Sequence, residues 1–165
     1  MESAGRPRAV TFAVESPSSA DAQWCLAQYI QDLDVRFPYG FDPAQSNPAA
    51  DEDMMLPKGL LLLARCDAEP VGCGALKLHD GWAELKRLWI AASARGLGLG
   101  RQMVFELERL AVRNRASLIR LETNKSLTEA ITLYRASGYR EVTPFNAEPY
   151  ADHWFEKPLL PDLYR

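Results

Sequence analysis

The sequence predicts an α+β protein built on a mostly antiparallel central sheet, flanked by helices, with one strand–helix–strand crossover. Apolar segments at 60–64, 71–78 and 82–90 follow one another with short turns between them, as in a three-stranded antiparallel meander. A helical apolar period then runs from 99 to 115 and leads into another strand-like segment at 118–123. At 165 residues, 47% of them hydrophobic, the chain has the size of one domain, since domains take roughly 100–200 residues.

The segments that precede this centre complete the first half of the predicted fold. Residues 8–15 alternate apolar and polar side chains, which is the period of a half-buried strand. Between 21 and 37, apolar side chains recur at spacings of three and four, which indicates an amphipathic helix. Residues 38–57 hold five prolines and glycines and an acidic cluster, so we expect a long loop. We expect a single domain over 1–165, with its core at about 8–157.

The C-terminal part of the chain is expected to add one helix and two short strands. Ser126 or Thr128 would cap the helix, and Gly138 would end it, because glycine adopts the left-handed conformation that terminates helices. Short strands are expected around 139–142 and 153–157.

Charge and composition exclude several classes of protein. Lys plus Arg is 19 and Asp plus Glu is 22, giving a net charge of −3, whereas nucleic-acid-binding proteins usually show a basic excess. Three cysteines and two histidines show no metal-ligand spacing, so we expect no metal, and reduced thiols in a cytoplasmic protein. The longest apolar run, 60–64, is far shorter than the roughly 20 residues that cross a bilayer, and the N-terminus has no apolar signal core. We therefore expect neither a nucleic-acid nor a membrane partner.

A glycine run opens the long helix of the crossover. Gly96, Gly98 and Gly100 alternate with leucines and are flanked by Arg95 and Arg101. Glycines allow a positive φ and a close approach of the backbone to a ligand, and the N–H groups at a helix start favour an anion. The run therefore indicates a phosphate or pyrophosphate site. The alternative is a turn that only packs the helix on the sheet.

Two kinds of nucleotide site fit the run poorly. A dinucleotide-binding site has the spacing G-x-G-x-x-G close behind a strand, whereas this run reads G-x-G-x-G and follows a five-residue segment. A P-loop needs Gly-Lys-Ser/Thr, and here Arg101-Gln102 follows the last glycine. A nicotinamide-binding oxidoreductase is accordingly the disfavoured alternative.

Two motifs resemble those of the GNAT superfamily of acyl-CoA-dependent N-acyltransferases. Residues 95–100 read Arg-Gly-Leu-Gly-Leu-Gly, which fits the family's acyl-CoA signature Q/R-x-x-G-x-G/A. Residues 130–139 read Ala-Ile-Thr-Leu-Tyr-Arg-Ala-Ser-Gly-Tyr, which fits the family's A-I-x-L-Y-x-x-x-G-F/Y. The resemblance covers about 58–157. It departs at Leu127, where many members have Asn, and Asn124 is the alternative residue for that contact.

The resemblance implies a GNAT-like fold whose crossover carries the acyl-CoA site, with acetyl-CoA as cosubstrate and no metal. It implies acetyl transfer to a primary amine of a small molecule, amino acid or peptide terminus by direct attack, and leaves room for a homodimer. The residues implied in acyl-CoA binding are Leu88, Trp89, Ile90, Arg95, Gly96, Leu97, Gly98, Leu99, Gly100, Arg101, Asn124 and Tyr134.

Two residues are candidates for the proton transfers. Glu84, eleven residues before Arg95, stands where family members carry a catalytic glutamate, and we expect it to act as general base through water. Its alternative role is a strand carboxylate paired with Lys86 or Arg87. Tyr134 matches the family's tyrosine that hydrogen-bonds the CoA sulfur, so the resemblance implies a general acid. Its alternative role is packing in the core.

The resemblance also implies that a backbone N–H near Leu88 or Trp89 holds the oxyanion, at a bulge where the strand splays. The acceptor is expected to meet the loops at 37–53 and 145–150, whose carboxylates and aromatic side chains would suit a cationic amine. The alternative function is a non-catalytic acyl-CoA-binding sensor or scaffold module, which would need neither Glu84 nor Tyr134.

Overall fold

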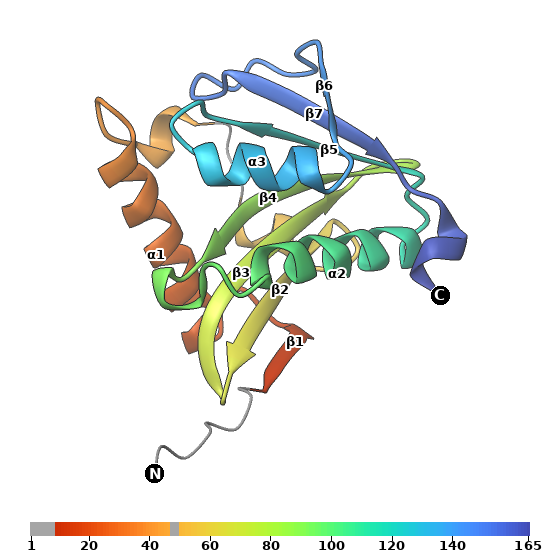
Figure 1. The fold of residues 1–165 in the computed structure, drawn as a ribbon, viewed down its shortest axis with the longest axis horizontal. Helices are drawn as coiled ribbons and strands as arrows, with labels where there is room; N and C mark the ends of the chain where they lie inside the picture. The colour runs from red at the N-terminus through yellow and green to blue at the C-terminus, as the bar shows by residue number, and fades with distance from the viewer. Residues whose placement is uncertain (1–8, 47–49) are drawn as a thin grey trace.

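A seven-stranded sheet with the order β1-β2-β3-β4-β5-β7-β6 forms the centre of the protein in the computed structural model, which describes residues 9–46 and 50–165 (Figure 1). The strands are β1 (Val10–Val14), β2 (Gly59–Cys66), β3 (Glu69–Leu78), β4 (Trp82–Ile90), β5 (Leu118–Thr123), β6 (Arg140–Val142) and β7 (His153–Pro158). The helices are α1 (Ala20–Arg36), α2 (Leu99–Arg113) and α3 (Thr128–Ala136), with 3-10 turns at Pro43–Gln45, Asp51–Met54, Ala92–Ala94 and Pro161–Tyr164.

The topology confirms the predicted α+β class. Strands β2 to β4 form the expected three-stranded antiparallel meander, and β1 pairs antiparallel with β2 at its edge. Strands β4 and β5 are the one parallel pair in the described sheet, and α2 joins them. The repeated parallel units of a dinucleotide-binding fold are therefore missing from the described residues. One detail was not predicted: β7 inserts between β5 and β6, so that the last strand of the chain is internal.

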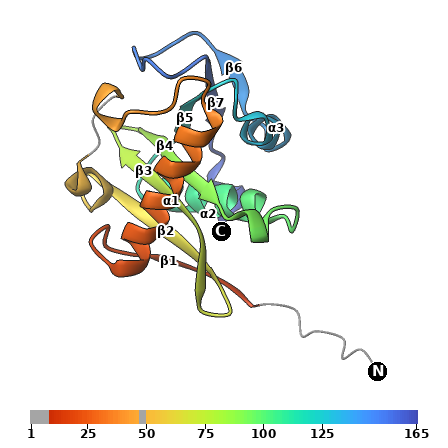
Figure 2. The ribbon, with the colours of Figure 1, turned by 90° about the vertical axis from the view of Figure 1, so that its left-hand side faces the viewer.

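The sheet is covered on both faces because β2 is apolar at consecutive positions. Leu60 and Leu62 point into a core that includes Met103 of α2 and Tyr134 of α3. The alternate side chain Leu61 points into a second core, which includes residues of α1. Figure 2 shows α1 lying over one face of the sheet, with α2 and α3 on the other. This explains why the run at 60–64 reads as continuously apolar rather than alternating.

Several predicted boundaries need correction. The first strand is an exposed edge rather than half-buried, with Val14 50% exposed, because it pairs with only one neighbouring strand. Helix α3 is capped by neither Ser126 nor Thr128: its N-cap is Leu127, without a side-chain hydrogen bond. Gly138 follows the helix at φ +91°, as predicted. The first residue of the predicted strand at 8–15 and Pro48 of the predicted loop lie outside the described residues.

None of the described helices is both long enough and apolar enough to span a membrane.

Candidate active site

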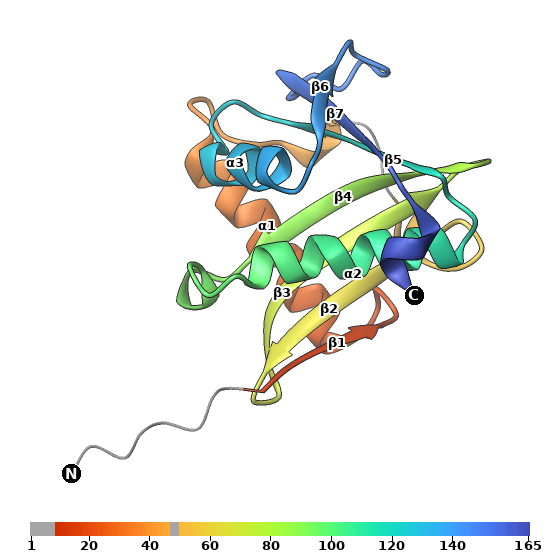
Figure 3. The ribbon, with the colours of Figure 1, turned by 45° about the vertical axis from the view of Figure 1, so that its right-hand side comes forward.

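The site begins where β4 and β5 separate. The two strands pair only at three positions, the last being Glu84 with Arg120, and then diverge toward α3 (Figure 3). In the same stretch the register of β4 against β3 shifts, so that Arg87 and Leu88 lie opposite the single residue Gly74. Arg87 has a φ of +55°. The bulge expected near Leu88 or Trp89 is therefore present, and a bulge leaves a backbone group of β4 out of the ladder.

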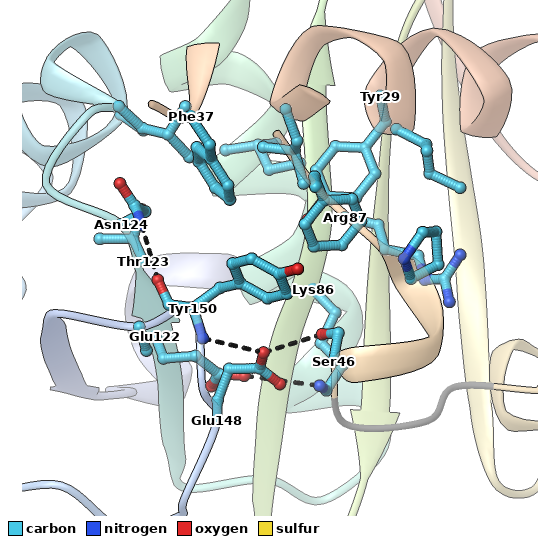
Figure 4. Close-up of a pocket in the computed structure, with 18 of the residues that line it drawn as sticks. Tyr29, Phe37, Ser46, Lys86, Arg87, Glu122, Thr123, Asn124, Glu148 and Tyr150 are labelled. Atoms are coloured by element: carbon cyan, nitrogen blue, oxygen red, sulfur yellow. Dashed lines mark hydrogen bonds and ion pairs between the residues drawn. The ribbon is translucent and has the colours of Figure 1, made fainter. Parts of the chain in front are cut away.

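A pocket of about 540 Å³ occupies this opening (Figure 4). Its walls come from the splayed strands, from α1 and α3, and from the loops before β2 and β7. The lining residues are Tyr29, Ile30, Leu33, Phe37, Phe41, Pro43, Ala44, Ser46, Ala50, Leu85, Lys86, Arg87, Leu88, Glu122, Thr123, Asn124, Leu127, Ala130, Tyr134, Glu148, Tyr150 and Ala151. Its volume falls within the roughly 300–1,000 Å³ typical of small-ligand sites.

Tyr134 lines the pocket from α3 and is only 5% exposed. Within the described residues, no hydrogen bond reaches its hydroxyl, although its ring packs against Tyr139 and Phe155. Burial raises the pKa of Tyr134, and the nearby Tyr29 and Glu122 raise it further. The hydroxyl therefore stays protonated over the physiological range and is available to donate into the pocket.

Glu84 is buried but does not line the pocket. One carboxylate oxygen lies 3.1 Å from His79 Nε2, and the other lies 3.2 Å from Lys86 Nζ. The pairing with Lys86 that was the alternative for Glu84 is thus present. Lys86 Nζ also lies 3.6 Å from Glu122 Oε1, so Lys86 connects Glu84 to a carboxylate that does line the pocket. His79, stacked on Trp82 at 3.9 Å between ring centroids, continues this chain of contacts outward.

The charged groups of this chain shift one another's pKa. Burial raises the pKa of Glu122, Lys86 lowers it, Glu84 raises it again, and the result lies above the ordinary value. Burial alone would lower the pKa of Lys86, but Glu122 and Glu84 outweigh burial, and its pKa is raised. Lys86 therefore remains an ammonium, while Glu122 is a more basic carboxylate than an exposed one.

Sequence reasoning overlooked three residues of the pocket: Tyr29, Lys86 as a link, and Glu122. The buried Glu148 belongs to the loop at 145–150 that was expected to meet the acceptor. Glu122 alternates with the buried Leu121 and Thr123 along β5, so the sequence could have placed it on the opposite face of that strand. Nothing in the sequence showed that this face turns toward the opening in the sheet.

The glycine run has the geometry of an anion site. Gly96 and Gly98 have φ of +82° and +76°. A Cβ placed on either glycine would have no heavy atom of the described residues within 4 Å, apart from its chain neighbours. Gly98 is the N-cap of α2, and no side chain caps the first turn. Unpaired N–H groups at a 15-residue helix start favour a phosphate group. A Cβ on Gly100 would lie 3.1 Å from Leu133 of α3, so the run closes against the helix that carries Tyr134.

The other residues implied in acyl-CoA binding are divided between the pocket and its surroundings. Leu88 and Asn124 line the pocket, whereas Trp89 is buried against Trp24 of α1. Arg95 turns away from the run: its Nε donates to the Ile90 carbonyl, and its guanidinium lies 3.4 Å from Asp32. Leu97 and Arg101 are exposed beside the run.

Asn124 is held within its own loop. Its amide nitrogen donates to the Tyr150 carbonyl at 2.7 Å, and its oxygen accepts from Ser126 N at 2.8 Å. Leu127, at the position where many family members carry Asn, also lines the pocket. Asn124 therefore orders the end of β5, and a role in cofactor binding stays a prediction.

Three features of the chain fit acetyl-CoA: a helix start without a side-chain cap and with open glycines, a pocket that continues along the bulged strand, and a tyrosine hydroxyl in its wall that has no hydrogen-bond partner among the described residues. The first fits a diphosphate, and the other two fit a thioester. Among the described residues, no three His, Cys, Asp or Glu side chains gather where they could hold a metal ion.

Substitution of Gly98 tests the diphosphate site. Gly98→Val should weaken acetyl-CoA binding more than tenfold, about 1.4 kcal/mol, because a β-branched residue resists the positive φ and covers the helix start. Gly81→Val is the matched control: Gly81 has φ +81° and equally open space, but lies in the turn between β3 and β4. Calorimetric titration of both variants with acetyl-CoA checks this. Equal affinities for Gly98→Val and the wild type would remove the run from the site.

Comparisons with known proteins agree with this geometry. Residues 27–139 match the acetyltransferase (GNAT) family. The chain is 34% identical over 157 residues to an IAA acetyltransferase of Azospirillum brasilense, covering 91% of this chain and 98% of the relative. A candidate acyl-CoA N-acyltransferase from Klebsiella pneumoniae shares 27% identity at a TM-score of 0.73, over 92% of this chain and 98% of that one.

A GNAT acetyltransferase of Elizabethkingia anophelis, solved with acetyl-CoA bound, shares the fold at a TM-score of 0.60 and 18% identity, over 91% of this chain and 98% of that one. Fold, site and comparisons together define an acyl-CoA-dependent N-acetyltransferase. The chain belongs to the GNAT family.

Proposed function

We propose that this enzyme transfers the acetyl group of acetyl-CoA to a primary amine of a small molecule, amino acid or peptide terminus. The observation that carries the proposal is the pocket between β4 and β5, which has the bulged strand along one wall and the Tyr134 hydroxyl in another. Acetyl-CoA supplies the activated thioester. A direct attack needs only one pocket open to both reactants, and the chain provides one.

The reaction has a net proton to release. The ammonium form of the amine must lose one proton before its nitrogen can attack the thioester carbonyl carbon. As the C–N bond forms and the C–S bond breaks, the nitrogen loses a second proton and the departing thiolate takes one up. Tyr134 donates that proton to the sulfur in our proposal, and is reprotonated from the amine side. The backbone N–H groups of the β4 bulge, near Leu88, hold the oxyanion.

Glu84 is the proposed base and acts through water. It is buried, and its contacts with Lys86 and His79 connect the pocket side of β4 to the half-buried His79. Since Glu84 does not line the pocket, a proton from the amine must cross at least one water or the neighbouring Glu122 to reach it. Glu84 therefore takes the proton away, and the residues of the pocket wall hold the amine.

Thiol release with a panel of amines tests the proposed function. The panel contains an alkylamine, an arylalkylamine, an amino acid and a peptide with a free N-terminus. IAA, after which the Azospirillum relative is named, is assayed separately beside this panel. We expect thiol release to depend on an amine and to match, mole for mole, a mass gain of one acetyl group on it. Tight binding of acetyl-CoA without any acetylated product would favour the sensor or scaffold module instead.

A further inference from the structure

Two loops that bond to each other lie at the acceptor end of the pocket. The backbone N–H of Asp42 donates to the Tyr150 hydroxyl at 3.0 Å, and Ser46 Oγ donates to Glu148 Oε1 at 2.9 Å. These bonds join the loop after α1 to the loop before β7. Figure 4 shows the bond between Ser46 and Glu148. A peptide chain would need an open groove between these loops. Their bonding leaves a compact end suited to a small molecule.

One side of this end is aromatic. Phe37, Phe41 and Tyr150 line the pocket, and their rings pack together. The ring centroids are 5.8 Å apart for Phe37 and Phe41, 5.7 Å for Phe37 and Tyr150, and 4.8 Å for Phe41 and Tyr150. Ile30 and Leu33 of α1 extend the same wall with aliphatic surface. A preformed wall of rings favours an apolar or aromatic body, because it removes that surface from water without reorganising the site.

The same end holds two carboxylates, the buried Glu148 and the half-buried Glu122. Glu122 and Glu148 both line the pocket, Glu122 from β5 and Glu148 from the loop before β7. Glu122 has Lys86 at 3.6 Å and accepts from Asn146 at 3.3 Å, and its pKa is raised by burial. A carboxylate that is costly to keep ionised in a pocket is stabilised by a cationic ligand. Tyr134, 5% exposed, lines the same cavity, and its hydroxyl has no hydrogen-bond partner among the described residues, which independently marks the cavity as a ligand site.

We infer that the acceptor is a small primary amine with an aromatic or bulky apolar body and no carboxylate beside the nitrogen. Its ammonium group lies at Glu122 and Glu148, and its body lies against Phe37, Phe41 and Tyr150. This inference rests on the proposed function and narrows its acceptor class. The pocket of about 540 Å³ must also admit the thioester, which favours a small acceptor.

Four probe amines test each part of the inference. Relative to 2-phenylethylamine, phenylalanine adds one carboxylate, ethylamine removes the ring, and a phenylalanyl dipeptide amide extends the chain. We expect kcat/KM for 2-phenylethylamine to exceed that for each of the others at least tenfold. The carboxylate of phenylalanine is repelled by Glu122, and ethylamine has no ring to pack against the aromatic wall. Equal rates with phenylalanine would mean that a basic side chain such as Arg87 receives a carboxylate. Equal rates with ethylamine or the dipeptide amide would also overturn the inference.

Two variants locate the subsites. Glu122→Gln should raise KM for 2-phenylethylamine about tenfold while KM for acetyl-CoA stays within twofold, because of the two substrates only the amine loses a charged partner. Phe41→Leu should reduce the preference for 2-phenylethylamine over ethylamine at least threefold. Glu141→Gln is the matched control, since this carboxylate is exposed on β6 and outside the pocket, and both constants should stay at wild-type values. Wild-type amine KM in Glu122→Gln would contradict the assignment.

A binding measurement separates this inference from the proposed function. Calorimetric titration of the enzyme–CoA complex with the four amines reports affinity without turnover, and the same order of preference is expected. If 2-phenylethylamine binds in that order but is not acetylated, the proposed function fails and the assigned subsite stands. If the amines are acetylated without that order, the proposed function stands and the inference fails.

Discussion

The Tyr134→Phe variant should bind acetyl-CoA normally and turn over about 10²-fold more slowly, the usual contribution of one positioned acid. The substitution keeps the ring, which packs against Tyr139 and Phe155, so folding should be preserved. It removes a hydroxyl that lies in the pocket wall without a hydrogen-bond partner among the described residues. The departing thiolate then has to take its proton from water.

The pH dependence of the wild type gives a second test of Tyr134. Burial, with help from Tyr29 and Glu122, raises the pKa of Tyr134 above its ordinary value of 10.0. A raised pKa keeps the acid protonated as the pH rises, so kcat should show no loss from this group between pH 7 and 10. In Tyr134→Phe the deficit should be the same at every pH in that range.

Tyr139→Phe is the matched control for this variant. Tyr139 is equally buried and adjacent, but its hydroxyl donates to Glu108 Oε2 at 2.8 Å and lies outside the pocket. Its loss should lower the unfolding free energy by about 1–3 kcal/mol, since a hydrogen bond to a charged group is broken, and leave kcat unchanged. Steady-state kinetics and thermal unfolding of both variants check the pair. Full turnover in Tyr134→Phe would assign Tyr134 to core packing.

Local patterns were enough to predict most of the fold. β4 begins and ends where predicted, and Gly138 ends α3, because side-chain period and glycine conformation are properties of neighbouring residues. The bulge beside Leu88 was expected only through the family resemblance, because it arises from the register with β3 rather than from the sequence of β4. The cap of α3 was missed because Asn124 already accepts from Ser126 N and holds the chain in a turn before the helix.

The candidate site was less predictable because its walls come from distant parts of the chain. Glu122 and Glu148 belong to different elements, and they face one cavity only because β4 and β5 diverge there. Glu84 illustrates the converse. Its position along β4 agreed with the family pattern, yet Lys86 lies between its carboxylate and Glu122, a contact set by side-chain direction rather than spacing. The motifs therefore predict residues for the cofactor side, whereas the acceptor side depends on contacts between distant elements.

The Glu84→Gln variant should lose about 10²-fold in kcat at pH 7, and the loss should shrink as the pH approaches 10. The amide keeps the size of the side chain but cannot accept the proton. At pH 7 only roughly one molecule in a thousand of an amine with a pKa near 10 is free base, and near pH 10 the free base is abundant and needs no acceptor. Since the pKa values of Lys86 and Tyr134 are both raised, the titration of neither group should mask the change in kcat between pH 7 and 10.

Parallel kinetics of Glu84→Gln and Glu122→Gln from pH 7 to 10 decide which carboxylate takes the proton. If Glu84 does, its variant shows a pH-dependent kcat deficit at unchanged acetyl-CoA KM, whereas Glu122→Gln changes mainly the KM for the amine. A pH-dependent kcat deficit found only in Glu122→Gln would move the base to the carboxylate that lines the pocket, leaving Glu84 to position Lys86 at 3.2 Å. A deficit in Glu84→Gln that stays constant across the range would likewise reduce Glu84 to a positioning residue, because a missing base matters less as free amine accumulates.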